Sequence, residues 1–254
     1  MAHAQLRFYA HLNDFLAYKR RQRLFRHRFD GLPSVKDMIE SLGVPHTEVA
    51  LILVNGAPVD FSYHVLDGDR ISVYPVFEHL ELPHEWSVQP QAAHEARFVA
   101  DVHLGRLAAY LRMVGFDTLY PDDYRDEELA RISSAEDRIL LTRDRGLLKR
   151  RIVQRGYAIR SPDPWRQLEE VIKRFNLYDQ IARFCRCAHC NGALERVDKA
   201  QVATQLPAKT TEYYDEFRRC LVCGKIYWRG SHYDQMDQFV ERILRERETT
   251  IGNR

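Results

Sequence analysis

The sequence predicts an α/β protein in three parts, because three stretches of the chain carry three different patterns. Residues 1–78 follow the order strand, strand, helix, strand, strand, and residues 97–182 alternate strands with helices. Residues 183–254 carry two Cys-x-x-Cys motifs and a charged tail with helical spacing. Residues 79–96 contain two prolines and no clear periodicity, which indicates a linker between the first two parts.

In the first part, the helix expected at residues 35–42 has the clearest boundaries. Ser34 precedes it, Asp37 stands at the capping-box position and Gly43 follows it, as in a capped helix. The apolar run at residues 49–54 indicates a strand, and the Asn55-Gly56 pair after it is a strong turn signal. The other strands are expected at residues 5–9, 26–29 and 71–76.

This order of elements, with the phrases VNG at residues 54–56 and LDGDRISVYP at residues 66–75, resembles the ubiquitin-like β-grasp family. The resemblance is greatest to the bacterial sulfur carriers, which end in a free Gly-Gly tail that is activated as a thiocarboxylate. Here the last strand continues into Phe77-Glu78 without a diglycine. We therefore expect a substrate-binding or interaction role for this part, and no sulfur transfer.

The central part alternates strands at residues 98–101, 116–120, 138–142 and 157–160 with helices at residues 104–114, 127–135, 146–154 and 165–175. Leu104, Leu107 and Leu111 have helical spacing, and Gly115 marks the end of that helix. A strand-helix alternation of this kind predicts a parallel sheet with right-handed crossovers.

Three aspartates are expected at the carboxyl ends of these strands, where open parallel sheets bind ligands. Asp101 ends the first strand, Asp126 follows the second, and Asp144 ends the third. Carboxylates gathered at one edge repel each other unless cations lie between them, which suits magnesium or manganese. Two such ions can activate water against a phosphodiester. Alternatively, these aspartates have only a local structural role, because aspartates at strand ends also cap helices and start turns.

The cysteines of the third part have the spacing of a tetrahedral zinc site. Two Cys-x-x-Cys turns, each running into a glycine, present four thiolates to one point. The expected ligands are Cys187, Cys190, Cys220 and Cys223. Because cysteine fills every position, the zinc is expected to be structural, with a redox motif or a disulfide pair as the alternatives. Cys185 is expected to be a spare thiol and His189 not to be a ligand.

Two basic clusters suggest contact with a phosphate backbone. The first lies between Lys19 and Arg28, includes Arg20, Arg21 and Arg23, and is interleaved with aromatic residues. The second runs through residues 143–155 and is interrupted only by Asp144. The alternative is that both are ordinary solvent-exposed faces of a strand and a helix.

Three phrases resemble the C-terminal RNase domain family named after the Mut-seven exonucleases: FVADVHLGRLAAYLRMVGFDTLY, DEELARISSAEDRILLTRDRGLL and FRRCLVCGKIYWRGSHYDQM. The resemblance covers nearly the whole chain. It implies a PIN-like, metal-dependent ribonuclease with an appended zinc ribbon, and bacterial members often carry a ubiquitin-like domain in front. The fold class expected is therefore a PIN-like parallel sheet domain with an N-terminal β-grasp domain and a C-terminal zinc ribbon.

The resemblance also carries over the candidate acids. Asp101 and Asp144 match the first and third strand-end acids, and Asp126 matches the helix-start acid. The remaining candidates are acids near these positions or in a family phrase, namely Asp117, Asp122, Asp123 and Glu127. Asp163 is the candidate for a fourth acid, with a helix cap as its alternative.

The arginines beside these acids would hold RNA phosphates or neutralise the transition state under this interpretation. They are Arg106, Arg112, Arg143 and Arg145. Ion pairs with local acids are the alternative for each of them. His103 is expected to be a surface histidine rather than a proton shuttle.

The bulk composition favours a globular protein in a reducing compartment. The net charge is only +2, so the chain is not a general polyanion binder. No apolar run is long enough to span a bilayer, and the first residues lack a signal-peptide pattern. We expect a cytoplasmic, metal-dependent ribonuclease that acts on RNA, with structured RNA such as tRNA as the candidate substrate. The alternative is a non-catalytic module that binds RNA or protein. The sequence does not identify a protein partner.

Overall fold

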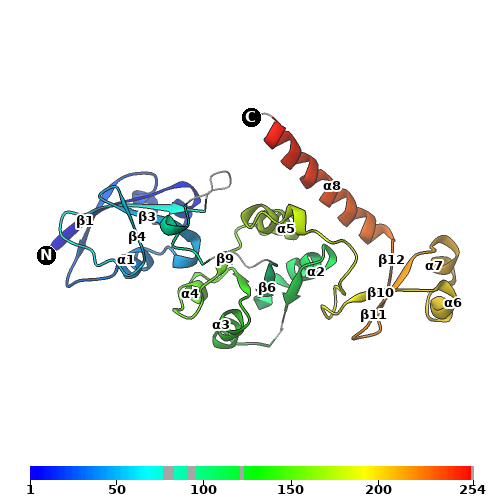
Figure 1. The fold of residues 1–254 in the computed structure, drawn as a ribbon. Coiled ribbons are helices and arrows are strands. Elements are labelled where there is room, and N and C mark those ends of the chain that lie inside the picture. Colours follow the sequence, from blue (N-terminus) through cyan, green and yellow to red (C-terminus); the bar gives the residue numbers. More distant parts are fainter. Residues whose placement is uncertain (77–82, 91–94, 121–122, 253–254) are drawn as a thin grey trace. The chain divides into compact units, whose positions relative to one another are not determined.

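The computed structural model describes residues 1–76, 83–90, 95–120 and 123–252 (Figure 1). Internal contacts divide the chain into two compact units. Unit 1 comprises residues 1–94 and 122–160, and unit 2 comprises residues 95–121 and 161–254. The expected central part, residues 97–182, therefore contributes to both units. The domain boundaries at residues 78, 96 and 182 stay predictions.

Unit 1 begins with a five-stranded sheet in the order β2-β1-β5-β3-β4. The strands are β1 (Ala2–Phe8), β2 (Phe25–Phe29), β3 (Val49–Val54), β4 (Ala57–Val59) and β5 (Arg70–Pro75). β1 pairs with β5 in parallel and with β2 antiparallel, which is the mixed arrangement of a β-grasp sheet. The predicted order of elements is confirmed. β4 was not predicted, because it is a three-residue edge strand that contains Pro58.

Local sequence signals set the boundaries of this sheet and of its helix, α1 (Val35–Ser41). The Ser34 hydroxyl accepts a hydrogen bond from the Asp37 amide at 3.1 Å and donates one to the Asp37 carboxylate at 2.7 Å. Asn55 and Gly56 both adopt positive φ, +53° and +90°, as a tight turn between β3 and β4 requires. Val35, Met38 and Ile39 form the buried face of the helix.

The second half of unit 1 contains α3 (Asp126–Ala135), β8 (Ile139–Thr142), α4 (Arg145–Leu148) and β9 (Gly156–Ala158). β8 and β9 pair in parallel, as predicted. The helix predicted at residues 146–154 is wrong in length, because α4 has only four residues. The chain turns after α4 instead and buries Val153.

Part of the expected linker packs against the β-grasp sheet. The Val88 amide donates to the Ala50 carbonyl at 2.9 Å. The Gln89 side-chain amide donates to the carbonyl of His46 at 3.3 Å, and also to that of Val49. Residues 83–90 therefore belong to the N-terminal fold, and residues 77–82 and 91–94 lie outside the described residues.

Unit 2 contains a second parallel pair, β6 (Arg97–Ala100) and β7 (Asp117–Leu119), with α2 (Gly105–Met113) between them. α2 packs against α5 (Pro164–Arg174), where Tyr110 stacks on Trp165 with ring centroids 4.4 Å apart. Gly115 ends α2 with a φ of +105°, and a Cβ there would lie 2.4 Å from the Ala182 carbonyl oxygen. Only glycine fits this position without strain.

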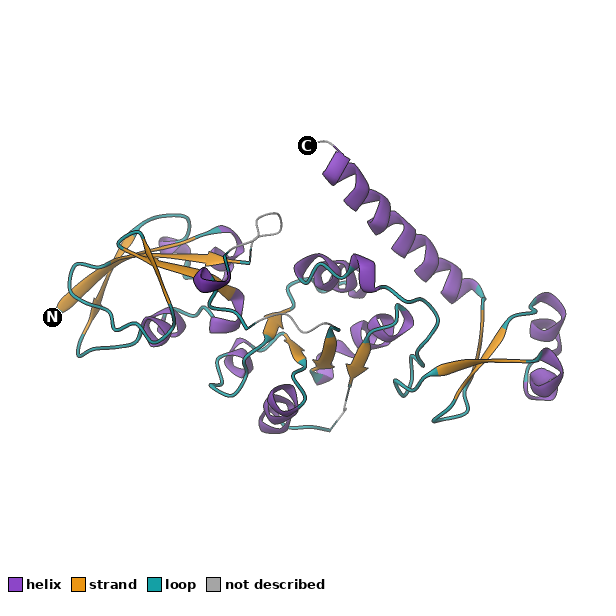
Figure 2. Ribbon diagram, viewed as in Figure 1, coloured by secondary structure: helices purple, strands orange, loops and turns teal. Residues whose placement is uncertain are grey.

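The third part begins with an antiparallel sheet of β10 (Leu194–Val197), β11 (Phe217–Cys220) and β12 (Ile226–Trp228). Two short helices, α6 (Lys199–Val202) and α7 (Ala208–Tyr213), lie in the sequence between β10 and β11 (Figure 2). The final helix, α8 (Ser231–Gly252), is longer than the predicted helical tail. No helix in the described part of the chain is both long and apolar enough to cross a membrane. The predicted fold class is confirmed.

Candidate functional site

Asp144 lies two residues beyond the end of β8, in the region where the parallel-strand argument expects a functional side chain. It is also the N-cap of α4, as its alternative interpretation expects. The Thr142 hydroxyl accepts from the Asp144 amide at 2.9 Å, which fixes the backbone at the strand end. Asp144 Oδ1 accepts from the Gly146 amide at 2.6 Å, and the residue is exposed. A Cβ on Gly146 would lie only 3.1 Å from Asp144 Oδ1, so glycine allows this close approach. The carboxylate is therefore held in place while remaining open to solvent.

Asp126 and Glu127 open α3, in the same unit as Asp144. The N-cap of this helix is Arg125, so the alternative interpretation of Asp126 as the cap is wrong. The Arg150 guanidinium lies 3.9 Å from the Asp126 carboxylate and 3.8 Å from the Glu127 carboxylate. Exposed pairs at such distances hold their partners weakly, so both carboxylates keep access to solvent.

Asp101 and Asp117 belong to unit 2. Asp101 follows β6, is 7% exposed and accepts from the Val102 amide at 2.6 Å. The Asp117 carboxylate accepts from the Asn191 side-chain amide at 2.8 Å, beside the first cysteine turn. Asp163 caps α5 by accepting from the Arg166 amide at 3.0 Å, as its alternative interpretation expects. Asp122 lies outside the described residues.

In the ranges that the structure describes, four cysteines are the one group of three or more metal-ligating side chains close enough to hold an ion. Asp101 lies in one unit, whereas Asp126 and Asp144 lie in the other. A shared magnesium or manganese site therefore stays a prediction.

Two arginines of separate basic clusters meet at one carbonyl group of the β-grasp part. The Asp14 carbonyl oxygen accepts from Arg21 at 3.4 Å and from Arg145 at 3.5 Å. The Arg145 guanidinium also lies 4.8 Å from the centre of the Phe15 ring, a cation–π contact. Arg21 of the first cluster is therefore close to the arginine that follows Asp144.

The other predicted RNA contacts differ in exposure. Arg23, Arg106 and Arg143 are exposed, and Arg20 is half-buried over the Phe25 ring at 5.3 Å. Arg112, in contrast, is 5% exposed. Its placement argues against the predicted RNA contact.

Arg112 instead links α2 to the first cysteine turn. It donates to the carbonyls of Thr118 at 2.8 Å, Ala188 at 3.1 Å and His189 at 2.8 Å. Burial lowers the pKa of Arg112 from its usual value, although nearby Cys187 opposes this shift. The three carbonyl acceptors make this buried cation a structural one.

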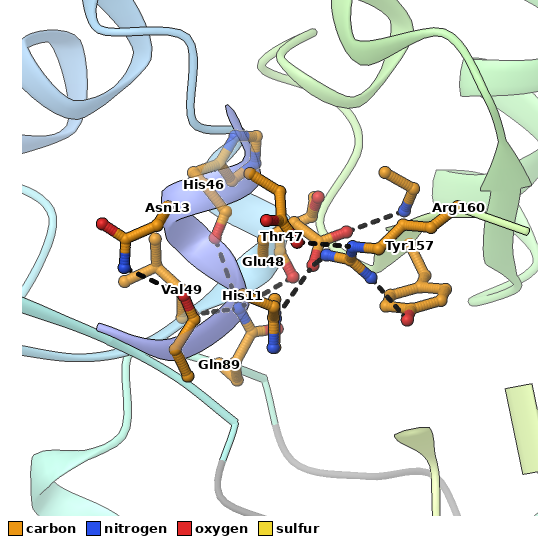
Figure 3. A network of polar contacts seen from close by, with 12 residues as sticks. His11, Asn13, His46, Thr47, Glu48, Val49, Gln89, Tyr157 and Arg160 are labelled. Atoms are coloured by element: carbon orange, nitrogen blue, oxygen red, sulfur yellow. Dashed lines mark hydrogen bonds and ion pairs between the residues drawn. The ribbon is translucent and has the colours of Figure 1, made fainter. Parts of the chain in front are cut away.

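A buried polar network fastens the β-grasp part to β9, and sequence reasoning did not find it (Figure 3). Glu48 has no exposed side-chain surface and accepts from the Ala158 amide at 2.7 Å. Arg160 donates to the other Glu48 oxygen at 3.0 Å and also to the Tyr157 hydroxyl. His11 lies 3.5 Å from that same Glu48 oxygen. One local feature of the sequence could have indicated this network: Glu48 is a charged residue immediately before the apolar strand β3.

His46 extends this joint to the end of the segment after α4. Its ring nitrogens contact the Glu40 carboxylate at 2.6 Å and the Val153 carbonyl at 2.8 Å. Lys149 donates to the Glu40 carbonyl at 2.8 Å. The β-grasp part thus contacts both β9 and the segment that follows Asp144.

The four predicted zinc ligands come together. Their sulfur atoms all lie within 4.8 Å of one another, with Cys187 and Cys223 3.6 Å apart and Cys190 and Cys220 3.4 Å apart. Sulfurs at about 2.3 Å from a tetrahedral zinc lie about 3.8 Å apart, so the spacing and donor set fit this metal. None of the five cysteines forms a disulfide in the structure.

The charge properties of the cluster suit a cation. Burial opposes ionisation of Cys187, but hydrogen bonds from the Tyr227 hydroxyl and from neighbouring backbone amides lower its pKa to about 7. Burial raises the pKa of Cys190 to about 12. Adjacent thiolates repel each other in a buried site, so a bound cation would favour ionisation of all four.

The first cysteine turn is also tied to β7. Asn191 adopts a φ of +69° and receives the Thr118 amide at 3.1 Å on its side-chain oxygen. Its side-chain nitrogen donates to Asp117, as described above. The cysteine cluster is therefore part of the packing of unit 2.

Two protein-family profiles match the chain. Residues 96–240, more than half of the 254 residues, match the Mut7-C RNAse domain. The chain belongs to the Mut7-C RNase domain family. Residues 1–81 match the Mut7-C ubiquitin domain, so the predicted two-domain order of this Mut7-C protein is confirmed. No curated protein and no solved structure matches the chain.

Proposed function

We propose that this Mut7-C protein is a metal-dependent ribonuclease that hydrolyses RNA phosphodiester bonds. The observation that carries the proposal is the placement of Asp144, an exposed carboxylate held by the Gly146 amide at the end of a parallel strand. Membership of an RNase domain family supports the same chemistry. Asp101 and Asp126 complete the proposed set of acids.

Magnesium or manganese, when bound, would supply an activated water and stabilise the leaving oxygen. The carboxylates of Asp101, Asp126 and Asp144 would hold the metal, with Glu127 as a neighbouring acid. Carboxylate oxygens are the donors that these hard cations prefer. The Gly146 amide orients Asp144, so little rearrangement of that side chain is needed.

The arginines around Asp144 would bind the RNA backbone. Arg143 and Arg145 flank Asp144 in the sequence, and Arg145 shares the Asp14 carbonyl with Arg21. Arg20 and Arg23 of the first basic cluster would add further phosphate contacts. Such contacts position a nucleic acid without reading its sequence, and structured RNA such as tRNA is the proposed substrate.

Zinc would have a structural role in this proposal. Four cysteines would fill its tetrahedral shell and leave no position for a substrate or water. A site that needs free thiols fits a reducing compartment, so the cytoplasm is the proposed location.

The direct test is cleavage of end-labelled tRNA and of an unstructured RNA by the purified full chain with added magnesium or manganese. We expect metal-dependent cleavage that Asp144→Asn abolishes. Asp163→Asn is the matched control, because asparagine also caps helices and Asp163 caps α5. Cleavage that survives Asp144→Asn would contradict the proposed site.

A non-catalytic RNA-binding module is the second candidate. The exposed arginines at residues 21, 23, 26 and 28 favour it, because they need no metal to bind RNA. It predicts tight binding without turnover and no effect of Asp144→Asn. The same assay separates the two candidates.

A further inference from the structure

A cavity of about 350 Å³ lies within unit 2, among β12, the start of α8 and residues 183–186. Five aromatic side chains line it, namely Phe184, Tyr214, Tyr227, Trp228 and Tyr233. The volume is at the low end of ligand pockets, which span roughly 300 to 1,000 Å³. A single small ring system fits such a space.

Contacts with neighbouring groups hold the aromatic wall in place. The Tyr227 hydroxyl lies 3.0 Å from the Cys187 sulfur, so this ring is tied to the cysteine cluster. Phe184 meets Tyr233 edge to face with ring centroids 4.9 Å apart. A Cβ on Gly230 would lie 2.9 Å from the Trp228 indole nitrogen, so glycine is needed for the indole to keep its position.

The three tyrosines and Trp228 are half-buried. Half-exposed rings around a cavity provide the flat surfaces on which unpaired nucleobases stack. Base stacking needs no particular base edge, so such a site tolerates many sequences.

The cations around the cavity suit a nucleotide rather than a neutral ligand. Lys225 lines the cavity and is exposed. The Arg218 guanidinium lies 5.1 Å from the centre of the Phe184 ring, but Arg218 is not among the lining residues. Arg186 lines the cavity and donates to the carbonyls of Gly115 at 3.1 Å and Asn191 at 3.2 Å. Arg183 is paired with Glu241 at 2.6 Å and with Asp237, so it contributes less net charge. Lys225 is therefore the best-placed partner for a phosphate.

We propose that this cavity binds one unpaired nucleobase of the RNA, stacked against the aromatic wall with the adjoining phosphate near Lys225. The proposal rests on the proposed function for the identity of the partner as RNA. It adds a second contact point, distant in sequence from Asp144, that recognises single-stranded RNA. A substrate with a folded part and a flipped or terminal base would engage both surfaces.

Two adjacent tyrosines allow a matched test. Tyr214 lines the cavity, whereas Tyr213 is 72% exposed and does not line it. The binding of a fluorescent single-stranded oligoribonucleotide and of a matched RNA duplex is measured with the full chain carrying Asp144→Asn, to limit cleavage. We expect Tyr214→Ala and Gly230→Ala to weaken single-strand binding by roughly 5- to 150-fold. Tyr213→Ala should bind normally, and duplex binding should be unchanged throughout.

Unchanged single-strand binding by both cavity variants would overturn the proposal. Because a variant can fail by misfolding, zinc content and thermal unfolding are measured for each. A crosslinking experiment gives an independent result. It uses RNA that contains 4-thiouridine and the protein with its cavity residues unchanged. Crosslinks at residues 227–233 support the cavity, and crosslinks confined to residues 19–28 contradict it.

The cleavage assay keeps the two proposals apart. If cleavage is normal and the cavity variants bind single-stranded RNA as well as the parent protein does, only the base-binding proposal is rejected. Cavity-dependent binding without metal-dependent cleavage would reject the nuclease alone and leave the base-binding site intact.

Discussion

Glu48 and Arg160 form an ion pair at 3.0 Å in which the glutamate side chain has no exposed surface. The second Glu48 oxygen accepts from the Ala158 amide, so one carboxylate links the β-grasp part to both the backbone and a side chain at the end of β9. A buried charge with these partners indicates a fixed joint, because loss of either partner leaves a charge in the interior. The β-grasp part of unit 1 is thus fixed to the parallel strands β8 and β9.

Replacement of Glu48 is expected to destabilise unit 1. Glu48→Ala leaves the Ala158 amide and Arg160 without this acceptor, so we expect the free energy of unfolding to fall by about 3 kcal/mol. Glu48→Gln should cost less, because its side-chain oxygen can still accept from the Ala158 amide. Urea unfolding of the full chain measures both. Glu195→Ala, at an exposed position, is the control, and equal stability of all variants would contradict the joint.

The shared Asp14 carbonyl predicts that Arg21 and Arg145 act on one RNA backbone. Arg21→Ala and Arg145→Ala should each weaken RNA binding and reduce the slope of log affinity against log salt by about one. Titrations at several salt concentrations measure this slope. Arg131→Ala, on the exposed side of α3, should leave the slope unchanged. If all three variants bind alike, the RNA backbone is bound elsewhere.

The cysteine cluster predicts a folded state that depends on zinc. Cys220→Ser should lower the bound zinc and the thermal midpoint, whereas Cys185→Ser should change neither, because Cys185 lies outside the cluster. Elemental analysis and thermal unfolding provide the two readouts. A strong chelator should also lower the bound zinc and the thermal midpoint, as Cys220→Ser does. Full stability after complete removal of zinc would exclude a structural role.

The lowered pKa of Cys187 gives the metal-free protein a pH dependence. A thiol that ionises at about 7 in the folded state and near its ordinary value of 9 in the unfolded state binds fewer protons when folded between these values. The free energy of unfolding should therefore rise from pH 7 to 9, and this contribution should be lost below pH 7. Denaturant titrations of the metal-free chain across this range test it. Cys187→Ser should remove the rise.

The sequence predicted well those elements whose boundaries are fixed by residues close to them in the sequence. Ser34 with Asp37 fixes the start of α1, and Asn55-Gly56 fixes the turn after β3, because each signal acts within four residues. The four cysteines were predicted for the same reason, since tight turns limit where their sulfurs can point. Local chemistry was sufficient in all these cases.

Long-range contacts explain what the sequence could not show. Arg112 looked like other arginines on a helix, and only its carbonyl partners at residues 188 and 189 reveal a buried role. Glu48 carries no motif, because Ala158 and Arg160, which donate hydrogen bonds to it, lie more than 100 residues away. The helix predicted at residues 146–154 failed because burial of Val153 competes with helical periodicity.

The joint at Glu48 also bears on how this chain can change over generations. Residues 122–160 share a compact unit with residues 1–94, so the N-terminal region cannot be exchanged as an independent cassette. Positions 48 and 160 should vary together among relatives that keep both regions. In a lineage that lost the N-terminal region, selection would no longer maintain an arginine at position 160, and the end of β9 would have to be covered by a different inherited segment.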